Sequence, residues 1–284
     1  MKTKTKFVCG AFAVLTCVAL SPVAQALNPP PDGGYANGTT AEGTQSLFSL
    51  TTGIWNTALG FQALNHATAG NQNTATGVRA LTNDTNGGFN TATGVYSLFS
   101  NTIGFFNSAT GAYSLANNTT GGNNTANGYG ALYYNTVGQQ NTATGFAALY
   151  KNTTESFNTA TGFQALFSNT GDGGHYNVAT GYQALFTNTT GRRNVAEGNA
   201  ALYSNTIGNF NVAVGDQALL SLATVDPSNG NGNGNTAIGE LAFASLTTGG
   251  GNTALGNSAL VNSITGYQNS ALGYVAGKKS HHRQ

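Results

Sequence analysis

A 17-residue unit repeats through most of this chain and constrains its fold more than any other feature of the sequence. Fourteen copies of the pattern Asn-Thr-Ala-Thr-Gly-x-x-Ala-Leu-x-x-Asn-Thr-Thr-Gly-x-x, numbered below as positions 1 to 17, cover residues 39–277. They begin at Thr39, Asn56, Asn73, Asn90, Asn107, Asn124, Asn141, Asn158, Asn177, Asn194, Asn211, Asn235, Asn252 and Asn269. A unit this short buries too little surface to fold alone, so neighbouring units must stack into one continuous solenoid.

Three columns of the repeat indicate what the interior of such a solenoid requires. Position 5 is Gly in all fourteen copies, as expected where the backbone needs a positive φ or a close approach to its neighbour. Position 3 is Ala in all fourteen, which predicts a lumen too narrow for a larger side chain. Position 9 is Leu in twelve copies, with Phe243 and Gly277 as the exceptions, and predicts one apolar plug in each coil.

Composition favours strands over helices. The units are rich in Asn, Thr and Gly and poor in Glu, Lys and Arg, and they lack an amphipathic stripe at helical spacing. The Asn-Thr-Ala-Thr-Gly segment alternates with period two and predicts a strand, and a second short strand is expected over Ala-Leu-x-x. We therefore predict an all-β fold, a parallel β-solenoid (β-roll) of about 14 stacked 17-residue coils with turns at the remaining segments.

The repeat resembles the head domains of trimeric autotransporter adhesins, the YadA-like family. The resemblance covers residues 39–277, although the present unit is longer by an extra Asn-Thr-Thr. The copies most similar to the family pattern are Asn235-Thr236-Ala237-Ile238-Gly239, Asn252-Thr253-Ala254-Leu255-Gly256 and Asn269-Ser270-Ala271-Leu272-Gly273. The resemblance implies a left-handed solenoid, a homotrimer and an adhesive role. No heptads follow Gly277, so a variant without the family's stalk or membrane anchor is expected.

The ends of the chain predict its destination. Residues 1–26 read as a secretory signal peptide, with Lys2, Lys4 and Lys6 before an apolar run and Ala24-Gln25-Ala26 at the cleavage site. Residues 27–38 form a Pro/Gly-rich leader, and residues 278–284 form a basic polar tail with Lys278, Lys279, His281 and His282. No further apolar segment is long enough to span a membrane. We expect a secreted protein that is extracellular, on the cell surface or in the periplasm.

Charge and chemistry exclude several classes of function. Without the three signal-peptide lysines, seven basic residues face nine acidic ones, a net charge of −2, so a nucleic-acid partner is not expected. His66 and His175 occupy variable turn positions and lack acidic or nucleophilic neighbours at motif spacing, so we predict neither an enzyme nor a cofactor. His281 and His282 supply too few ligands for a metal site, and the glycine-rich insert at residues 229–234 reads as a flexible loop.

Aromatic residues recur in two columns and predict an interaction surface. Position 17 holds Trp55, Phe89, Phe106, Phe157, Tyr176 and Phe210, and position 10 holds Phe48, Phe99, Tyr133, Tyr150, Phe167, Phe186 and Tyr203. On stacked coils these columns form rows of rings roughly 5 Å apart. One interpretation is that the rows stack on themselves or are buried between subunits of the expected homotrimer. The other is that they offer stacking faces to a glycan or to a host or matrix protein.

Two alternatives to an adhesive role remain open. Thr-x-Thr recurs at positions 2 and 4, and such an array resembles the ice-binding face of β-solenoid antifreeze proteins. The complete pairs are Thr74 and Thr76, Thr91 and Thr93, Thr142 and Thr144, and Thr159 and Thr161. The position 4 column is apolar at Leu59 and from Val214 onward, which favours subunit contacts there. The third function considered is that of an extracellular filament or matrix subunit that pairs through its coil ends.

Overall fold

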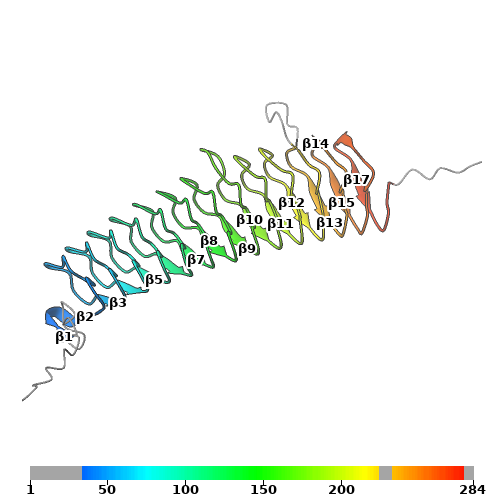
Figure 1. Cartoon of the computed structure of the whole chain (residues 1–284). Helices are drawn as coiled ribbons and strands as arrows, with labels where there is room; N and C mark the ends of the chain where they lie inside the picture. Colours follow the sequence, from blue (N-terminus) through cyan, green and yellow to red (C-terminus); the bar gives the residue numbers. More distant parts are fainter. Residues whose placement is uncertain (1–33, 224–231, 278–284) are drawn as a thin grey trace, which may run out of the picture.

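The repeat folds into one long parallel β-solenoid. The computed structural model describes residues 34–223 and 232–277, and the predicted signal peptide, the tail, most of the leader and part of the glycine-rich insert lie outside these ranges. The chain winds through about 13 turns at 17-residue spacing, which confirms the all-β parallel solenoid. Figure 1 shows the coils stacked in sequence order from one end of the rod to the other.

Strands are short, and most coils carry one. The elements are β1 Gly34–Tyr35, a 3₁₀ turn at Ala36–Gly38, β2 Thr39–Glu42, β3 Thr57–Leu59, β4 Thr74–Thr76, β5 Thr91–Thr93, β6 Ser108–Thr110, β7 Thr125–Asn127, β8 Thr142–Thr144, β9 Thr159–Thr161, β10 Val178–Thr180, β11 Val195–Glu197, β12 Val212–Val214, β13 Thr236–Ile238, β14 Thr248–Gly250, β15 Thr253–Leu255, β16 Thr265–Tyr267 and β17 Ser270–Leu272. All but β14 and β16 belong to one sheet of 15 strands.

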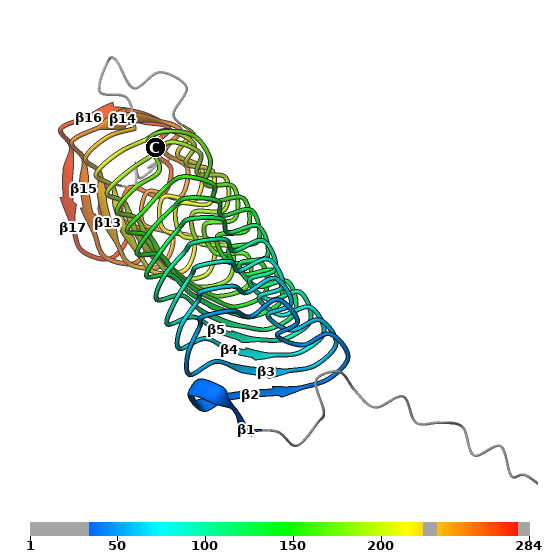
Figure 2. The same cartoon turned by 90° about the vertical axis from the view of Figure 1, so that its left-hand side faces the viewer.

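The main sheet keeps every repeat position in register. Ala58 of β3 pairs with Ala75 of β4, and the same position pairs with itself along the stack from β2 to β17. Figure 2 shows these strands following one another along one face of the rod. The alanine of each strand points inward and is fully buried from Ala58 to Ala254, as the invariant column predicts. Positions 2 and 4 therefore face outward.

The prediction of a second strand over Ala-Leu-x-x is wrong. In that segment positions 7 and 9 have left-handed backbones, as in Gln62 (φ 56°) and Leu64 (φ 49°), and the chain makes a tight double turn. The turn is fixed between coils, since the Leu64 amide donates to the Ala80 carbonyl at 3.0 Å. A β-strand would continue in an extended direction, whereas two residues with left-handed backbones reverse the direction of the chain within the coil.

Glycine at position 5 satisfies both requirements inferred from the sequence. Its φ lies between 118° and 137° in all fourteen copies, a region that side-chain-bearing residues rarely adopt. A Cβ on Gly77 would lie 2.6 Å from the carbonyl oxygen of Gly94 in the next coil. The stack can therefore keep its coil-to-coil distance only with glycine at this position.

Two columns of buried asparagine form hydrogen-bonded ladders through the interior. At position 1 the backbone amide and Nδ2 of Asn107 donate to Oδ1 of Asn90 at 3.0 and 3.1 Å, and Asn107 Nδ2 also donates to the Gly121 carbonyl at 2.9 Å. Asn124 repeats these bonds with Asn107. Each ladder links successive coils and satisfies backbone groups that the narrow lumen would otherwise leave unpaired.

The second ladder, at position 12, runs from Asp84 to Asn205. Within it Asn118 Nδ2 donates to Asn101 Oδ1 at 2.8 Å and to the Gly121 carbonyl at 3.0 Å. Oδ1 of Asn205, at the far end, is buried without a partner because the next coil has Leu222 at this position. Burial raises the pKa of Asp84 to about 7, against hydrogen bonds from Asn101 and Gly87 that lower it.

The N-terminal coil carries a small cap. Gly34–Tyr35 pairs antiparallel with β2, and the 3₁₀ turn at Ala36–Gly38 follows it directly. These residues belong to the end of the segment expected to be an extended leader. The Trp55 amide donates to the Asn37 carbonyl at 3.0 Å, so the cap is bound to the first coil as the coils are bound to one another.

Candidate functional site

The position 17 row lies on the surface of the single chain. Its six aromatic members, Trp55, Phe89, Phe106, Phe157, Tyr176 and Phe210, are 45–58% exposed. Phe89 stacks on Phe106 and Phe157 on Tyr176, both with ring centroids 4.8 Å apart. The row continues through Arg193, whose guanidinium carbon lies 5.8 Å from the Tyr176 ring and 5.4 Å from Phe210. Polar residues at this position in other coils divide it into short segments.

The position 10 row is a longer ladder that is less exposed than expected. Its rings stack from coil to coil with centroids 5.1 to 5.3 Å apart, in the order Tyr133, Tyr150, Phe167, Phe186 and Tyr203. All five are half-buried, because each ring covers a face of the next, whereas Phe48 at the N-terminal end is 62% exposed. The expectation that this row stands on a strand is wrong, since it lies on the double turn.

A third row, at position 6, was not identified from the sequence. Tyr129, Phe146, Phe163 and Tyr182 stack with centroids 5.2 to 5.4 Å apart and are exposed. Rings recur in this column over four successive copies, which is the signal that could have revealed it. Val78, Val95 and Ala112 separate these rings from Phe61 in the same column and obscure the pattern.

Positions 6, 7 and 10 form one aromatic surface on the double turn. Tyr96 and Tyr113 at position 7 stack at 5.4 Å, and Tyr96 contacts Phe99 at position 10 edge-on at 5.1 Å. Tyr113 in turn contacts Tyr129 at position 6, at 5.8 Å. The rows at positions 6 and 10 are therefore joined into a band that follows the rod axis, which we call the turn band. The position 17 row lies outside the double turn and is not part of the turn band.

A depression of about 270 Å³ opens in the turn band between Tyr113, Tyr129, Tyr133 and Tyr150. Partial burial raises the pKa of Tyr150 above its usual value, and Tyr134, Tyr133 and Tyr129 act in the same direction. The Tyr150 hydroxyl is therefore protonated at neutral pH and can donate a hydrogen bond as well as accept one.

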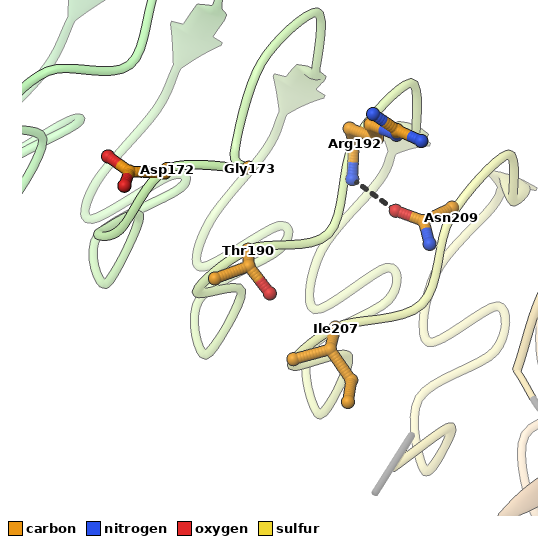
Figure 3. A pocket seen from close by; sticks show the side chains of 6 residues that line it. All are labelled: Asp172, Gly173, Thr190, Arg192, Ile207 and Asn209. Carbon is orange, nitrogen blue, oxygen red and sulfur yellow. Dashed lines mark hydrogen bonds between the residues drawn. The ribbon is translucent and has the colours of Figure 1, made fainter. Parts of the chain in front are cut away.

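A second depression, of about 370 Å³, adjoins the two-residue insertion in the coil that begins at Asn158. Figure 3 shows its lining residues, Asp172, Gly173, Thr190, Arg192, Ile207 and Asn209. The Arg192 amide donates to Asn209 Oδ1 at 2.9 Å, which continues the coil-to-coil bonding along its floor. The side chains of Asp172 and Arg192 extend in different directions, so the depression has no converging polar groups.

The outward face of the main sheet carries hydroxyl columns. Thr74 and Thr76 of β4 pair in register with Thr91 and Thr93 of β5, and the outer positions of both strands are half-buried or exposed. The same arrangement recurs in β8 and β9. Apolar residues replace threonine toward the C-terminal end, where Ile238 is 43% exposed. The sheet face is thus divided into a hydroxyl part and an apolar part.

Chemistry-bearing side chains are scattered over the rod. His66 Nδ1 lies 3.0 Å from Asn83 Oδ1, and His175 Nδ1 accepts the Ser156 amide at 2.8 Å. Within residues 34–223 and 232–277 no three His, Cys, Asp or Glu side chains gather as metal ligands would. In those same ranges no helix has the length and hydropathy needed to cross a bilayer.

Comparison with known proteins adds no identification. No model of a known protein family matches the chain, and neither the curated proteins nor the solved structures give a match.

Proposed function

We propose that this protein is a secreted or surface-exposed, non-enzymatic adhesin-like rod that binds its target through stacked aromatic side chains. The observation that carries the proposal is the turn band, in which rings at positions 6, 7 and 10 follow one another at 5.1 to 5.4 Å over many coils. Large exposed aromatic patches on soluble proteins mark interaction sites. The signal-peptide pattern at residues 1–26 supports export.

Repetition makes weak contacts useful in such a rod. A single aromatic contact contributes only roughly 1 kcal/mol beyond the area it buries. The same contact presented on successive coils engages a repetitive target, such as a polysaccharide or a matrix protein, with much greater avidity than affinity. The resemblance to heads of trimeric autotransporter adhesins supports the same role and names the target class, a glycan or a host or matrix protein.

A binding screen with matched variants tests this role. Phe146, Phe163, Phe167 and Phe186 are replaced by Ser, and the protein is compared with the parent on immobilised glycans and matrix proteins. Because these rings supply the stacking faces of the turn band, we expect binding to fall at least about tenfold. The control replaces Thr93, Thr110, Thr144 and Thr161 on the sheet face by Ser. Undiminished binding by the aromatic variant would refute the role.

We further propose that the rod is left-handed and assembles as a homotrimer, as the resemblance implies. The apolar part of the sheet face, formed by Val214, Ile238, Leu255 and Leu272, is at least partly exposed in a single chain and would be buried between copies. Sedimentation equilibrium at micromolar concentration is expected to give three times the chain mass. Replacement of Ile238 and Leu255 by Lys is expected to yield monomers. A monomeric parent protein would contradict the assembly.

Ice binding is the second candidate, and one observation favours it. The threonine hydroxyls of β4, β5, β8 and β9 lie in register on one sheet face, roughly 4.8 Å apart between strands. If this face orders water, the protein will show thermal hysteresis that is lost when Thr76, Thr93, Thr144 and Thr161 are changed to Lys. The absence of hysteresis at millimolar protein would remove this candidate and leave the adhesive role untouched.

A further inference from the structure

The tyrosine depression marks the place where three aromatic ladders stop. The position 6 ladder begins at Tyr129, the position 10 stack that runs to Tyr203 begins at Tyr133, and the position 7 pair ends at Tyr113. In the adjoining coil the corresponding side chains are small, namely Ala112 before Tyr129, Ala116 before Tyr133 and Gly130 after Tyr113. The gap therefore arises from missing side chains in three neighbouring columns, at one level of the rod.

The terminal rings lack the parallel neighbour that their columns supply elsewhere. Tyr129 and Tyr133 stack on one side on Phe146 and Tyr150, at 5.4 and 5.1 Å. On the other side each meets Tyr113 at a steep angle, 68° and 54°, instead of a stacked ring. A wedge of about 270 Å³ remains among Tyr113, Tyr129, Tyr133 and Tyr150, bounded by ring surfaces and phenolic hydroxyls.

We propose that this wedge binds one hexopyranose ring of a glycan. This proposal identifies the ligand class of the adhesive surface, and it rests on the adhesive role proposed above. A pyranose has an apolar C–H face that stacks on an aromatic ring and a rim of hydroxyls that exchange hydrogen bonds with tyrosine hydroxyls. The wedge is concave and exposes more polar than apolar surface, which suits a ligand that carries several hydroxyls.

Charge favours a neutral sugar over an organic cation, the other ligand that aromatic cages take. No carboxylate lines the wedge. A cationic ligand would therefore find no counter-charge in the wedge.

Ladder-extending variants separate binding from folding. Ala116→Phe adds a ring before Tyr133, and Gly130→Tyr adds one after Tyr113 at a φ of 61°, close to the 59° of Tyr113 itself. Ala116→Phe should stack on its ladder and preserve stability as it fills the wedge. A Cβ at Gly130 would lie 3.1 Å from Cε2 of Tyr150, so Gly130→Tyr must displace that ring slightly as it fills the wedge. Ala200→Tyr, which adds a ring at position 7 far along the rod, is the matched control.

Saturation-transfer NMR on the full chain reads out binding, with methyl glycosides of glucose, galactose, mannose and N-acetylglucosamine and with tetramethylammonium as probes. We expect transfer to the ring C–H protons of at least one glycoside, retained in Ala200→Tyr and weakened at least about tenfold in Ala116→Phe and Gly130→Tyr. Thermal unfolding confirms that the variants fold. Should both ladder-extending variants unfold, Tyr129→Ser and Tyr133→Ser replace them with the same expected loss.

Three results would overturn the assignment: no glycoside binding by the parent, equal binding by the folded ladder-extending variants, or binding of tetramethylammonium alone. The adhesive role is judged separately by the Phe-to-Ser variant of the turn band. If that variant loses adhesion while Ala116→Phe keeps it, the adhesive role stands and the sugar wedge fails. If the Phe-to-Ser variant still adheres, the adhesive role itself fails.

Discussion

At the scale of single residues, the fold depends on backbone positions with positive φ. These positions are of two kinds, which differ in the value of φ and in the residues that they accept. Positions 7, 9 and 17 have φ near 55° and are mostly occupied by ordinary residues, including Leu64 and Phe89. Position 5 has φ above 115° and accepts only glycine. The first kind costs roughly 1–2 kcal/mol per residue, which the coil-to-coil hydrogen bonds offset. The second leaves no room for a Cβ wherever another coil follows.

The same Gly-to-Ala replacement should therefore have different effects at the two kinds of position. Gly77→Ala places a Cβ 2.6 Å from the Gly94 carbonyl at φ 134° and is expected to destabilise the fold by roughly 3 kcal/mol or more. Gly130→Ala, at φ 61°, places its Cβ 3.1 Å from Cε2 of Tyr150, a half-buried side chain that can shift by a few tenths of an ångström, and is expected to cost only about 1 kcal/mol. Urea unfolding of both variants measures the two free-energy losses. Equal losses of unfolding free energy would refute the difference between the two kinds of position.

Asp84 predicts a pH dependence of stability. Burial raises its pKa from the ordinary value of 3.8 to about 7 in the folded chain, so the folded state favours the protonated form. Stability from this group is complete below about pH 4 and is lost as the pH rises to about 7, by roughly 4 kcal/mol. Asp84→Asn, which restores the asparagine of the ladder, should remove that loss.

Denaturation midpoints of parent and Asp84→Asn at pH 4, 6 and 8 test this. The variant is expected to gain stability over the parent progressively with pH, most at pH 8. Midpoints that change in parallel with pH would show that Asp84 does not titrate in this range.

At the scale of elements, the sequence predicted the strand and missed the turn. The Thr-Ala-Thr alternation and the invariant Gly and Ala columns were sufficient for the main sheet. The sequence predicts a strand at Ala-Leu-x-x because leucine gives no sign that its φ will be positive. In the structure that conformation is held by the hydrogen bond from Leu64 to Ala80 in the next coil. The asparagine ladders likewise need coil-to-coil distances that one sequence does not contain.

The candidate surface was predictable to a similar extent. The rows at positions 10 and 17 follow from rings recurring at a fixed spacing. The position 6 row is hidden by the aliphatic residues Val78 and Val95 in the same column. The wedge arises from absent side chains at Ala116 and Gly130, and an absence in one column has meaning only when its spatial neighbours are known.

The ladder at position 12 should respond to substitution according to where it is broken. Asn118→Leu, in the middle, leaves Asn101 Oδ1 and one Asn135 hydrogen without their partners and is expected to cost roughly 2–3 kcal/mol. Asn205→Leu, at the end beside Leu222, removes an oxygen that is already unpaired and should cost roughly half as much. Thermal melts compare the two, and an equal or larger loss for Asn205→Leu would contradict a continuous ladder.

At the scale of the whole molecule, the rod is a set of columns that run the length of the stack. Each column has its own chemistry: alanine and leucine inside, asparagine along the interior edges, threonine on the sheet face and aromatic rings on the turn band. Contacts are made with the adjacent coil at a sequence distance of 17 residues, so every column depends on the same register. Folding and the proposed binding surface therefore both require that successive coils stay in the same register.

Removal of one complete unit tests that requirement most directly. A chain lacking residues 90–106 should fold, because every column then joins its own kind across the junction, and its rod should shorten by roughly 4.8 Å in small-angle X-ray scattering. A chain lacking residues 90–107 is left with one 16-residue unit without its position 1 asparagine, whereas no step between units in the sequence is shorter than 17 residues, and it should not fold. Collapse of the first deletion, or a folded rod from the second, would contradict the register on which the structure and the proposed function both depend.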